Sequence, residues 1–169
     1  MKNNNAINPS LPILPVELLT GIPEVQDIEF HKKIYSAIKK RTFEKLIKKF
    51  KLNSCTEINK ELEFIQKIFA SSGWGEIKTI DIQQESKRAI ITLENSPFAI
   101  ALKGKTKLPA DILLRGALAG IFSKIFNEDI DCVESECSAL QGKQCKFIVK
   151  PKTEFDFSKK IVQDQLNYE

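Results

Sequence analysis

Groups that catalysis commonly requires are scarce in this chain of 169 residues, which has a single histidine. It has no Gly-rich phosphate loop, no Ser/His/Asp set and no pair of poised carboxylates. It also lacks a nicotinamide or flavin fingerprint that could deliver a hydride. These absences weigh against an enzyme, so we assign no catalytic residue.

Long hydrophobic runs are also missing. No apolar segment approaches the length that spans a membrane, so no membrane partner is expected. The N-terminus lacks the pattern of a signal peptide because polar residues and prolines interrupt it: Asn3, Asn4, Asn5, Pro9, Pro12 and Pro15. We therefore expect a soluble cytoplasmic protein whose four cysteines are reduced, a state that favours metal binding over disulfides.

Positive charge is in small excess, with 26 Lys and Arg against 22 Asp and Glu. Many basic residues lie in one stripe: Lys32, Lys33, Lys39, Lys40, Arg41, Lys45, Lys48 and Lys49. Such a stripe can meet phosphates. No aromatic residues or nucleic-acid motif accompany it, so we interpret it as a solvated helix face and expect no nucleic-acid partner. His31, at its start, is expected on the surface.

With 42% apolar residues the chain can bury one core. We divide it into an N-terminal arm (1–23), a ligand-binding domain (24–151, with its core motif at 108–150) and a C-terminal tail or helix (152–169). The arm carries apolar residues that are expected to pack on its own domain or on a second subunit: Leu11, Ile13, Leu14, Val16, Leu18 and Leu19.

Apolar periodicity predicts helices and strands in a definite order. Residues 24–51 are expected to form one long helix or two, and residues 57–71 another. Period-two segments around Ile80 and Ile91 predict two strands joined by a charged turn at 85–87.

After a break at 95–97, Pro109 is expected to open a helix that runs to about Phe126. Gly116 and Gly120 lie on one face of this helix and allow another backbone to approach closely. Two further strands complete the order, which predicts an α+β fold: an antiparallel β-sheet with helices packed over it.

The segment DCVESECSALQGKQCKF (131–147) gathers potential metal ligands around a predicted tight hairpin. A turn centred on Gly142 places Cys137 and Cys145 opposite each other on paired strands. Thiolates suit zinc, and Glu134 can supply a third ligand of a tetrahedral site.

Two other interpretations of the cysteines stay open: opposed cysteines also form disulfides, or are simply buried apolar side chains. Glu134 and Cys137 differ by an odd number of residues, so only a bulge or twist brings them to one face. An irregular strand is therefore predicted there. Cys55 and Cys132 are interpreted as core or packing residues.

The wider segment LLRGALAGIFSKIFNEDIDCVESECSALQGKQCKFIV resembles the 4-vinyl reductase domain family, which combines a Gly-x-x-x-Gly helix with a Glu-x-x-Cys and Gly-x-x-x-Cys-x-Phe hairpin. The matching residues are Gly116, Gly120, Glu134, Cys137, Gly142, Cys145 and Phe147. A looser resemblance continues upstream through GWG (73–75) and NSPFAIAL (95–102). It covers roughly the C-terminal two thirds of the chain.

This resemblance implies a zinc site. The sensor domains of bacterial aromatic-responsive regulators are similar to this region, and they hold a structural zinc with one Cys before the glycine helix plus the Glu and two Cys. Glu134, Cys137 and Cys145 match three of these ligands, and the fourth position falls on Asp111. A carboxylate there makes the site harder and weaker. Alternatively, Asp111 is a helix-start residue that complements the helix dipole.

The resemblance also implies the ligand-binding fold of the nitric oxide signalling and TRAPP type, whose members enclose a haem, an aromatic molecule or an acyl chain. The pocket implied in this chain is lined by Trp74, Phe98, Ile121 and Phe122. The other interpretation is that these four residues fill an ordinary core.

These observations lead to one main expectation: a dimeric, non-catalytic domain that binds an apolar, aromatic or lipid-like small molecule beside a structural zinc. Closed tetrahedral coordination leaves zinc no open position for a substrate. One alternative is an enzyme or accessory factor in tetrapyrrole metabolism, where the family name points to vinyl group reduction. The other is a protein–protein interaction or scaffold module, as the tethering relatives and the apolar arm suggest.

Overall fold

Four antiparallel strands form the centre of the fold. The computed structural model describes residues 16–46 and 58–167, so predictions about Cys55, Lys48, Lys49 and most of the N-terminal arm lie outside the described residues. The strands are β1 (Glu76–Gln83), β2 (Arg88–Glu94), β3 (Ile130–Glu136) and β4 (Cys145–Pro151), and their order in the sheet is β1-β2-β4-β3. The predicted α+β class with an antiparallel sheet is confirmed.

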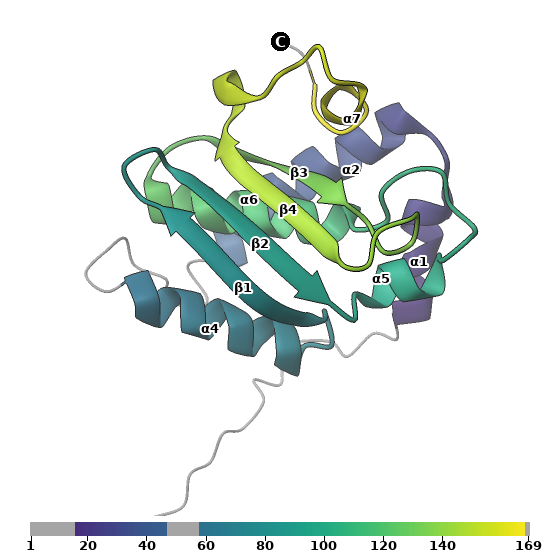
Figure 1. Ribbon diagram of the computed structural model, residues 1–169, viewed down its shortest axis with the longest axis horizontal. Coiled ribbons are helices and arrows are strands. Elements are labelled where there is room, and N and C mark those ends of the chain that lie inside the picture. Colours follow the sequence, from purple (N-terminus) through teal and green to yellow (C-terminus); the bar gives the residue numbers. More distant parts are fainter. Residues whose placement is uncertain (1–15, 47–57, 168–169) are drawn as a thin grey trace, which may run out of the picture.

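The described helices cover one face and the two ends of this sheet (Figure 1). Helices α2 and α6 lie behind the sheet, α4 lies beside β1, and α7 lies near β3 at the opposite edge. Their bounds are α1 Val16–Glu24, α2 Ile28–Arg41, α4 Ile58–Ser71, α5 Pro97–Ala101, α6 Ile112–Phe126 and α7 Lys160–Gln163, with a π-helical turn η1 (Thr42–Leu46) and a 3₁₀ turn η2 (Lys152–Glu154). None of these helices is long and apolar enough to cross a membrane.

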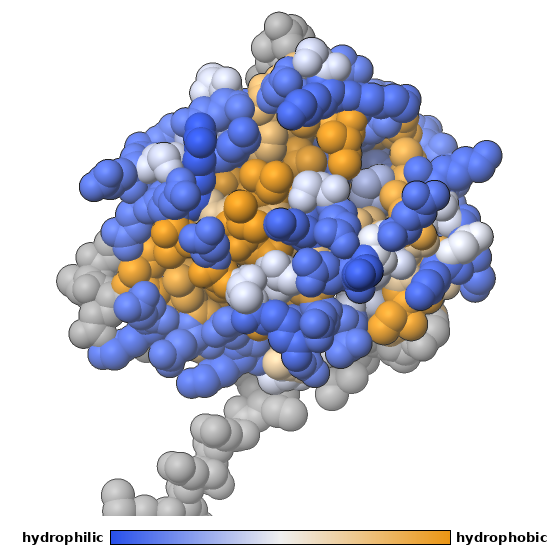
Figure 2. Space-filling model, viewed as in Figure 1, coloured by the Kyte–Doolittle hydropathy of each residue, from blue (hydrophilic) through white to orange (hydrophobic). Residues whose placement is uncertain are grey.

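Alternating side chains give the sheet one buried and one open face. In β2, Ala89, Ile91 and Leu93 are buried toward the helices, whereas Ile90 is 37% exposed on the other side. Ile90 pairs with Ile148 of β4, which is only partly buried. Figure 2 shows the resulting apolar strip across the open face of the sheet.

Helix α6 is the core of the molecule. Thirteen of its fifteen residues are buried, because it lies between the sheet and α2 and therefore needs apolar side chains all around. Its two glycines allow the contact with α2: a Cβ on Gly116 would lie 2.9 Å from the carbonyl oxygen of Tyr35, and one on Gly120 would lie 2.7 Å from that of Lys39. The predicted close packing on the glycine face is present.

Several local expectations differ from the structure. The helix expected from Pro109 begins at Ile112, because residues 109 and 110 still belong to the loop that leads to the N-cap Asp111. A short helix, α5, follows the expected break at 95–97, with Ser96 capping the backbone N–H of Ala99. Residues 16–24 of the predicted arm form α1, which contacts α5.

His31 is buried, with 4% of its surface exposed, so its predicted surface position is wrong. The chain turns between α1 and α2, and this turn brings the carbonyl oxygen of Val25 to 2.6 Å from Nε2 of His31. Burial lowers the pKa of His31. Helical periodicity alone could not show this, because the covering segment comes from another element.

The close contact between α6 and α2 predicts a contrast between two glycine-to-alanine substitutions. Gly120→Ala places a methyl group against the backbone of Lys39 and is expected to lower the free energy of unfolding by about 1–3 kcal/mol. Gly21→Ala in α1 is the matched control, because nothing lies within 4 Å of its added Cβ. It is expected to be neutral or stabilising by up to about 1 kcal/mol. Chemical denaturation of both variants measures the contrast, and equal stabilities would contradict it.

Candidate metal centre

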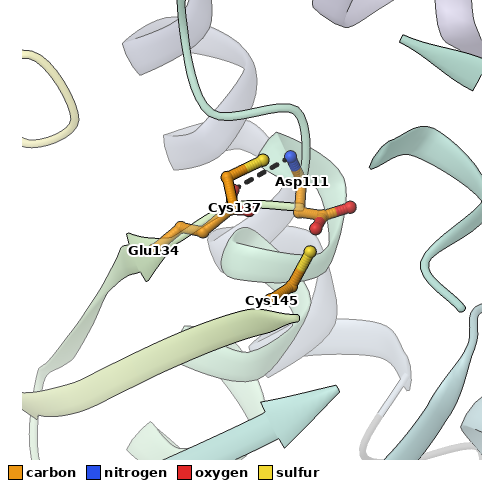
Figure 3. A group of neighbouring side chains, drawn as sticks. All are labelled: Asp111, Glu134, Cys137 and Cys145. Atoms are coloured by element: carbon orange, nitrogen blue, oxygen red, sulfur yellow. Dashed lines mark hydrogen bonds between the residues drawn. The ribbon is translucent and has the colours of Figure 1, made fainter. Parts of the chain in front are cut away.

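Four side chains that can each donate a metal ligand meet at the start of α6. Asp111, Glu134, Cys137 and Cys145 are all buried, and one ligand atom from each lies within 4.8 Å of the other three. Figure 3 shows these side chains converging from the α6 N-terminus, from β3 and its following loop, and from the start of β4. The structure thus brings together the full set of ligands that the sequence resemblance implied.

A bulge brings Glu134 and Cys137 to the same site. The pairing of β3 with β4 is regular up to Glu134 and shifts between Glu134 and Glu136. This is the irregular strand that the odd spacing predicted. Cys137 follows the last paired residue of β3, and Cys145 is the first residue of β4.

The connection between the two cysteines is longer than the predicted tight hairpin. Residues 137–144 form a loop rather than a two-residue turn, and Gly142 returns to donate its N–H to the carbonyl oxygen of Cys137 at 3.0 Å. A Cβ on Gly142 would lie 2.6 Å from Cγ of Glu136. The loop therefore closes around the cluster only because residue 142 has no side chain.

Backbone and hydroxyl donors surround the cluster. The N–H of Asp111 donates to Oε2 of Glu134 at 3.1 Å (Figure 3), and the N–H of Ala110 donates to Sγ of Cys137 at 3.4 Å. The Ser96 hydroxyl donates to Oδ1 of Asp111. Ser138 contacts Sγ of Cys145 through both its N–H, at 3.5 Å, and its hydroxyl, at 3.3 Å. Donors of this kind favour the deprotonated forms that bind metals.

Two buried oxygens of the cluster have no hydrogen-bond partner: Oδ2 of Asp111 and Oε1 of Glu134. A buried polar atom without a partner costs free energy, and a bound cation removes this cost. Two thiolates and two carboxylates form a donor set that zinc accepts. Ligands of a tetrahedral zinc lie roughly 3.3–3.8 Å apart, so the observed group needs only a small contraction. The residues therefore fit this metal.

The ionisation of the four side chains is strongly perturbed. Burial raises the pKa of Asp111, and burial together with the negative charge of Asp111 raises the pKa of Glu134 well above its ordinary value. A hydrogen bond from the Cys145 thiol lowers the pKa of Cys137 to about 6, and the same contact raises the pKa of Cys145. Without a cation the cluster shares protons, and a metal would displace them.

The two alternative interpretations of the cysteines can be compared with this geometry. No disulfide joins the three cysteines that the structure describes, Cys132, Cys137 and Cys145. Cys132 is fully buried in the apolar core, in agreement with its interpretation as a packing residue. Asp111 is the N-cap residue of α6, yet its side chain makes no capping hydrogen bond. Its carboxylate is directed to the cluster instead (Figure 3).

The four residues proposed for a ligand pocket lie in or against the core. Phe98, Ile121 and Phe122 are buried, and Trp74 is partly buried with its ring edge-on to Phe69. A cleft of about 430 Å³ lies elsewhere, between the end of α2 with η1 and the end of α6. Phe43, Ser123 and Asn127 are among its lining residues.

Sequence reasoning missed the polar residues that hold the cluster in place. Ser138 directly follows a ligand, and Ser96 lies in the NSP break, so local sequence offered some signal for both. Arg115 and Gln165 offered none, because each meets the cluster region only through the folding of distant segments.

The fold and the buried acid–thiol cluster together define a class of α+β domain, and comparison with known proteins specifies it. The family model of the 4-vinyl reductase domain matches residues 89–151, which run from β2 to β4. This match confirms the resemblance to that family. A search of curated proteins found no match.

Solved structures share the fold at low sequence identity. The phenol-responsive sensory domain of the transcription activator PoxR is similar with a TM-score of 0.69 and 14% identity, over 92% of this chain and 83% of that chain. Trafficking protein particle complex subunit 3 from Naegleria fowleri, covalently bound to palmitic acid, has a TM-score of 0.55 and 17% identity over 79% and 88%. A vinyl-4-reductase family protein from Methanocaldococcus jannaschii matches at 0.49 and 18% over 83% of both chains, too weakly for further argument.

The raised pKa values predict how the metal-free protein responds to pH. A buried carboxyl with a raised pKa stabilises the fold below its ordinary value, 3.8 for Asp111, and this contribution is lost as pH rises through the folded-state pKa. Asp111→Asn removes the charge but can still accept from Ser96. We expect the variant to gain stability relative to the metal-free wild type as pH rises from about 4 to 7. Thermal melting in chelator measures this difference, and a constant difference would contradict it.

Proposed function

We propose that this protein is a small-molecule-binding domain of the 4-vinyl reductase type, stabilised by a structural zinc held by Asp111, Glu134, Cys137 and Cys145. One observation carries the proposal: four buried ligand atoms from three separate elements lie within 4.8 Å of one another. Two of these side chains also have buried oxygens that lack any other partner. Such a cluster is costly to bury without a cation.

The zinc in this proposal links the elements that form one end of the fold. Asp111 belongs to the start of α6, Glu134 to β3, Cys137 to the loop and Cys145 to β4. All four positions of a tetrahedral ion are then occupied by protein, which leaves none for a substrate. The metal is therefore structural, and the activity we propose is binding without turnover.

The small-molecule part of the proposal rests on the relatives and on one cleft. The titles of two similar structures name bound small molecules, phenol for the PoxR sensory domain and palmitic acid for the trafficking subunit. In this chain, the cleft of about 430 Å³ beside Phe43 has the size of a small-ligand site. We propose that an apolar or aromatic molecule binds there.

The homodimer and the cytoplasmic location expected from the sequence remain part of the proposal. Native mass spectrometry of protein purified without a histidine tag or chelator reports assembly, metal content and retained small molecules in one measurement. We expect a dimer with one zinc per chain.

Substituting the thiol ligands tests the metal site. Cys137→Ser and Cys145→Ser are each expected to weaken zinc binding by more than about 100-fold and to lower the melting temperature, because each removes a ligand. Cys132→Ser is the matched control: it also replaces a buried sulfur, which destabilises the core, but it should retain one zinc per chain. Zinc content measured after dialysis separates the variants. Full zinc content in both ligand variants would rule out the proposed site.

Substitutions on two sides of α6 test where a small molecule binds. Phe43→Ala removes the largest apolar side chain among the lining residues of the cleft and is expected to weaken the binding of phenol or palmitate by roughly tenfold or more. Trp74→Ala, in the pocket expected from the sequence, should leave the affinity nearly unchanged. Isothermal titration calorimetry measures both. The opposite result would place the ligand among Trp74, Phe98, Ile121 and Phe122.

A further inference from the structure

The outer edge of β3 has no neighbouring strand among the described residues, and side chains pair with its backbone instead. Ser123 accepts from the N–H of Ile130 at 3.0 Å, and the Tyr35 hydroxyl accepts from the N–H of Cys132 at 2.9 Å. At Glu134 the side chain of Gln165 does both: its Oε1 accepts from the N–H, and its Nε2 donates to the carbonyl oxygen, each at 2.9 Å. An exposed strand edge would leave these groups free.

Gln165 therefore acts on Glu134 as a neighbouring strand would. Glu134 is the last residue of β3 in regular register before the bulge. Beyond that point the β4 ladder no longer restrains the backbone regularly. The primary amide of Gln165 supplies the missing restraint, and it does so at the residue whose carboxylate enters the metal cluster.

Residues 160–166, here called the docking segment, carry Gln165 to this position. The segment comprises α7 and the residues after it, and three of its side chains are buried: Val162 at 4% exposure, Gln165 at 3% and Leu166 at 2%. It packs near β3 at the edge of the sheet (Figure 1).

Arg115 connects the docking segment to the helix that carries Asp111. It lies one helical turn after Asp111 and is 2% exposed. Its Nη1 donates to Oε1 of Gln165 at 2.7 Å, to the carbonyl oxygen of Gln165 at 3.3 Å and to that of Cys132 at 3.4 Å. Its guanidinium also lies over the Tyr35 ring, 4.8 Å from the centroid. One buried cation thus holds α6, β3 and the docking segment together.

We propose that Gln165 and Arg115 are positioning residues of the metal centre, and that the docking segment binds β3 more tightly when the cluster holds zinc. This inference rests on the proposed function. Zinc draws the Glu134 carboxylate inward and fixes its backbone, which presents the N–H and carbonyl groups that Gln165 pairs with. In the metal-free protein no cation draws the carboxylates of Asp111 and Glu134 together, and the backbone at the bulge can shift.

Because linkage is reciprocal, loss of the docked segment must weaken zinc binding by the same factor that zinc strengthens docking. Undocking also removes the partner of Glu134 and leaves an unpaired position on the edge of β3. Metal occupancy at a buried site would thereby change the surface of the molecule at one edge of its sheet.

Hydrogen exchange of the full chain, with zinc and with chelator, tests the proposal. We expect zinc to slow amide exchange in residues 160–166 by about 5- to 100-fold in the wild type. In Gln165→Ala this zinc effect should disappear, and chelator competition should show a zinc affinity roughly tenfold to a hundredfold weaker. The absorption spectrum of the cobalt-substituted variant should also shift, because the geometry at Glu134 changes.

Gln163→Ala is the matched control, since Gln163 lies in α7, is exposed, and hydrogen-bonds locally to the carbonyl oxygen of Phe157. It should retain the zinc effect and the cobalt spectrum. Gln165→Glu serves if the alanine variant does not fold, because it keeps the acceptor for Glu134 and Arg115 and loses only the donor. Zinc binding without any change in exchange at 160–166 would overturn this inference and leave the proposed function intact. Absence of zinc binding in the wild type would overturn both.

Discussion

Burial of four ionisable side chains at one point is the constraint on which the rest of this structure depends. Two carboxyl groups and two thiols can share a dry site only if protons or a cation neutralise them. The surroundings meet this need with backbone N–H groups, serine hydroxyls and one buried arginine. A bound metal would complete the neutralisation and provide a partner for the two carboxylate oxygens that lack one.

Helix α6 links the cluster to the remainder of the fold. Because its glycines bring it against α2 while its apolar side chains pack on the sheet, its position leaves little freedom. Asp111 at its N-terminus is thereby held opposite the β3–β4 loop, and Arg115 is held against β3. Core packing and ligand placement are therefore two results of the same arrangement, and a change in either is felt by the other.

The described cleft and the cluster have different relations to sequence. The cluster residues lie in a short motif whose spacing and residue types are diagnostic, so they were predicted individually. The residues expected to line a pocket, Phe98, Ile121 and Phe122, are buried in the core, whereas Phe43 lines a cleft at the far end of α2. An aromatic residue in a core and one beside a cavity have the same sequence signature, and only packing distinguishes them.

The sequence by itself determined the elements and the candidate ligands: period-two segments for β1 and β2, the glycine face of α6, the irregular strand at Glu134 and the Glu-x-x-Cys spacing. These features depend on neighbouring residues, so local physics specifies them. Only the tertiary structure decided that His31 is buried by the turn at Val25, that Asp111 reaches the thiols, and that Gln165 completes the edge of β3. Each of these contacts joins segments that the backbone path brings together, and residue spacing carries no record of that path.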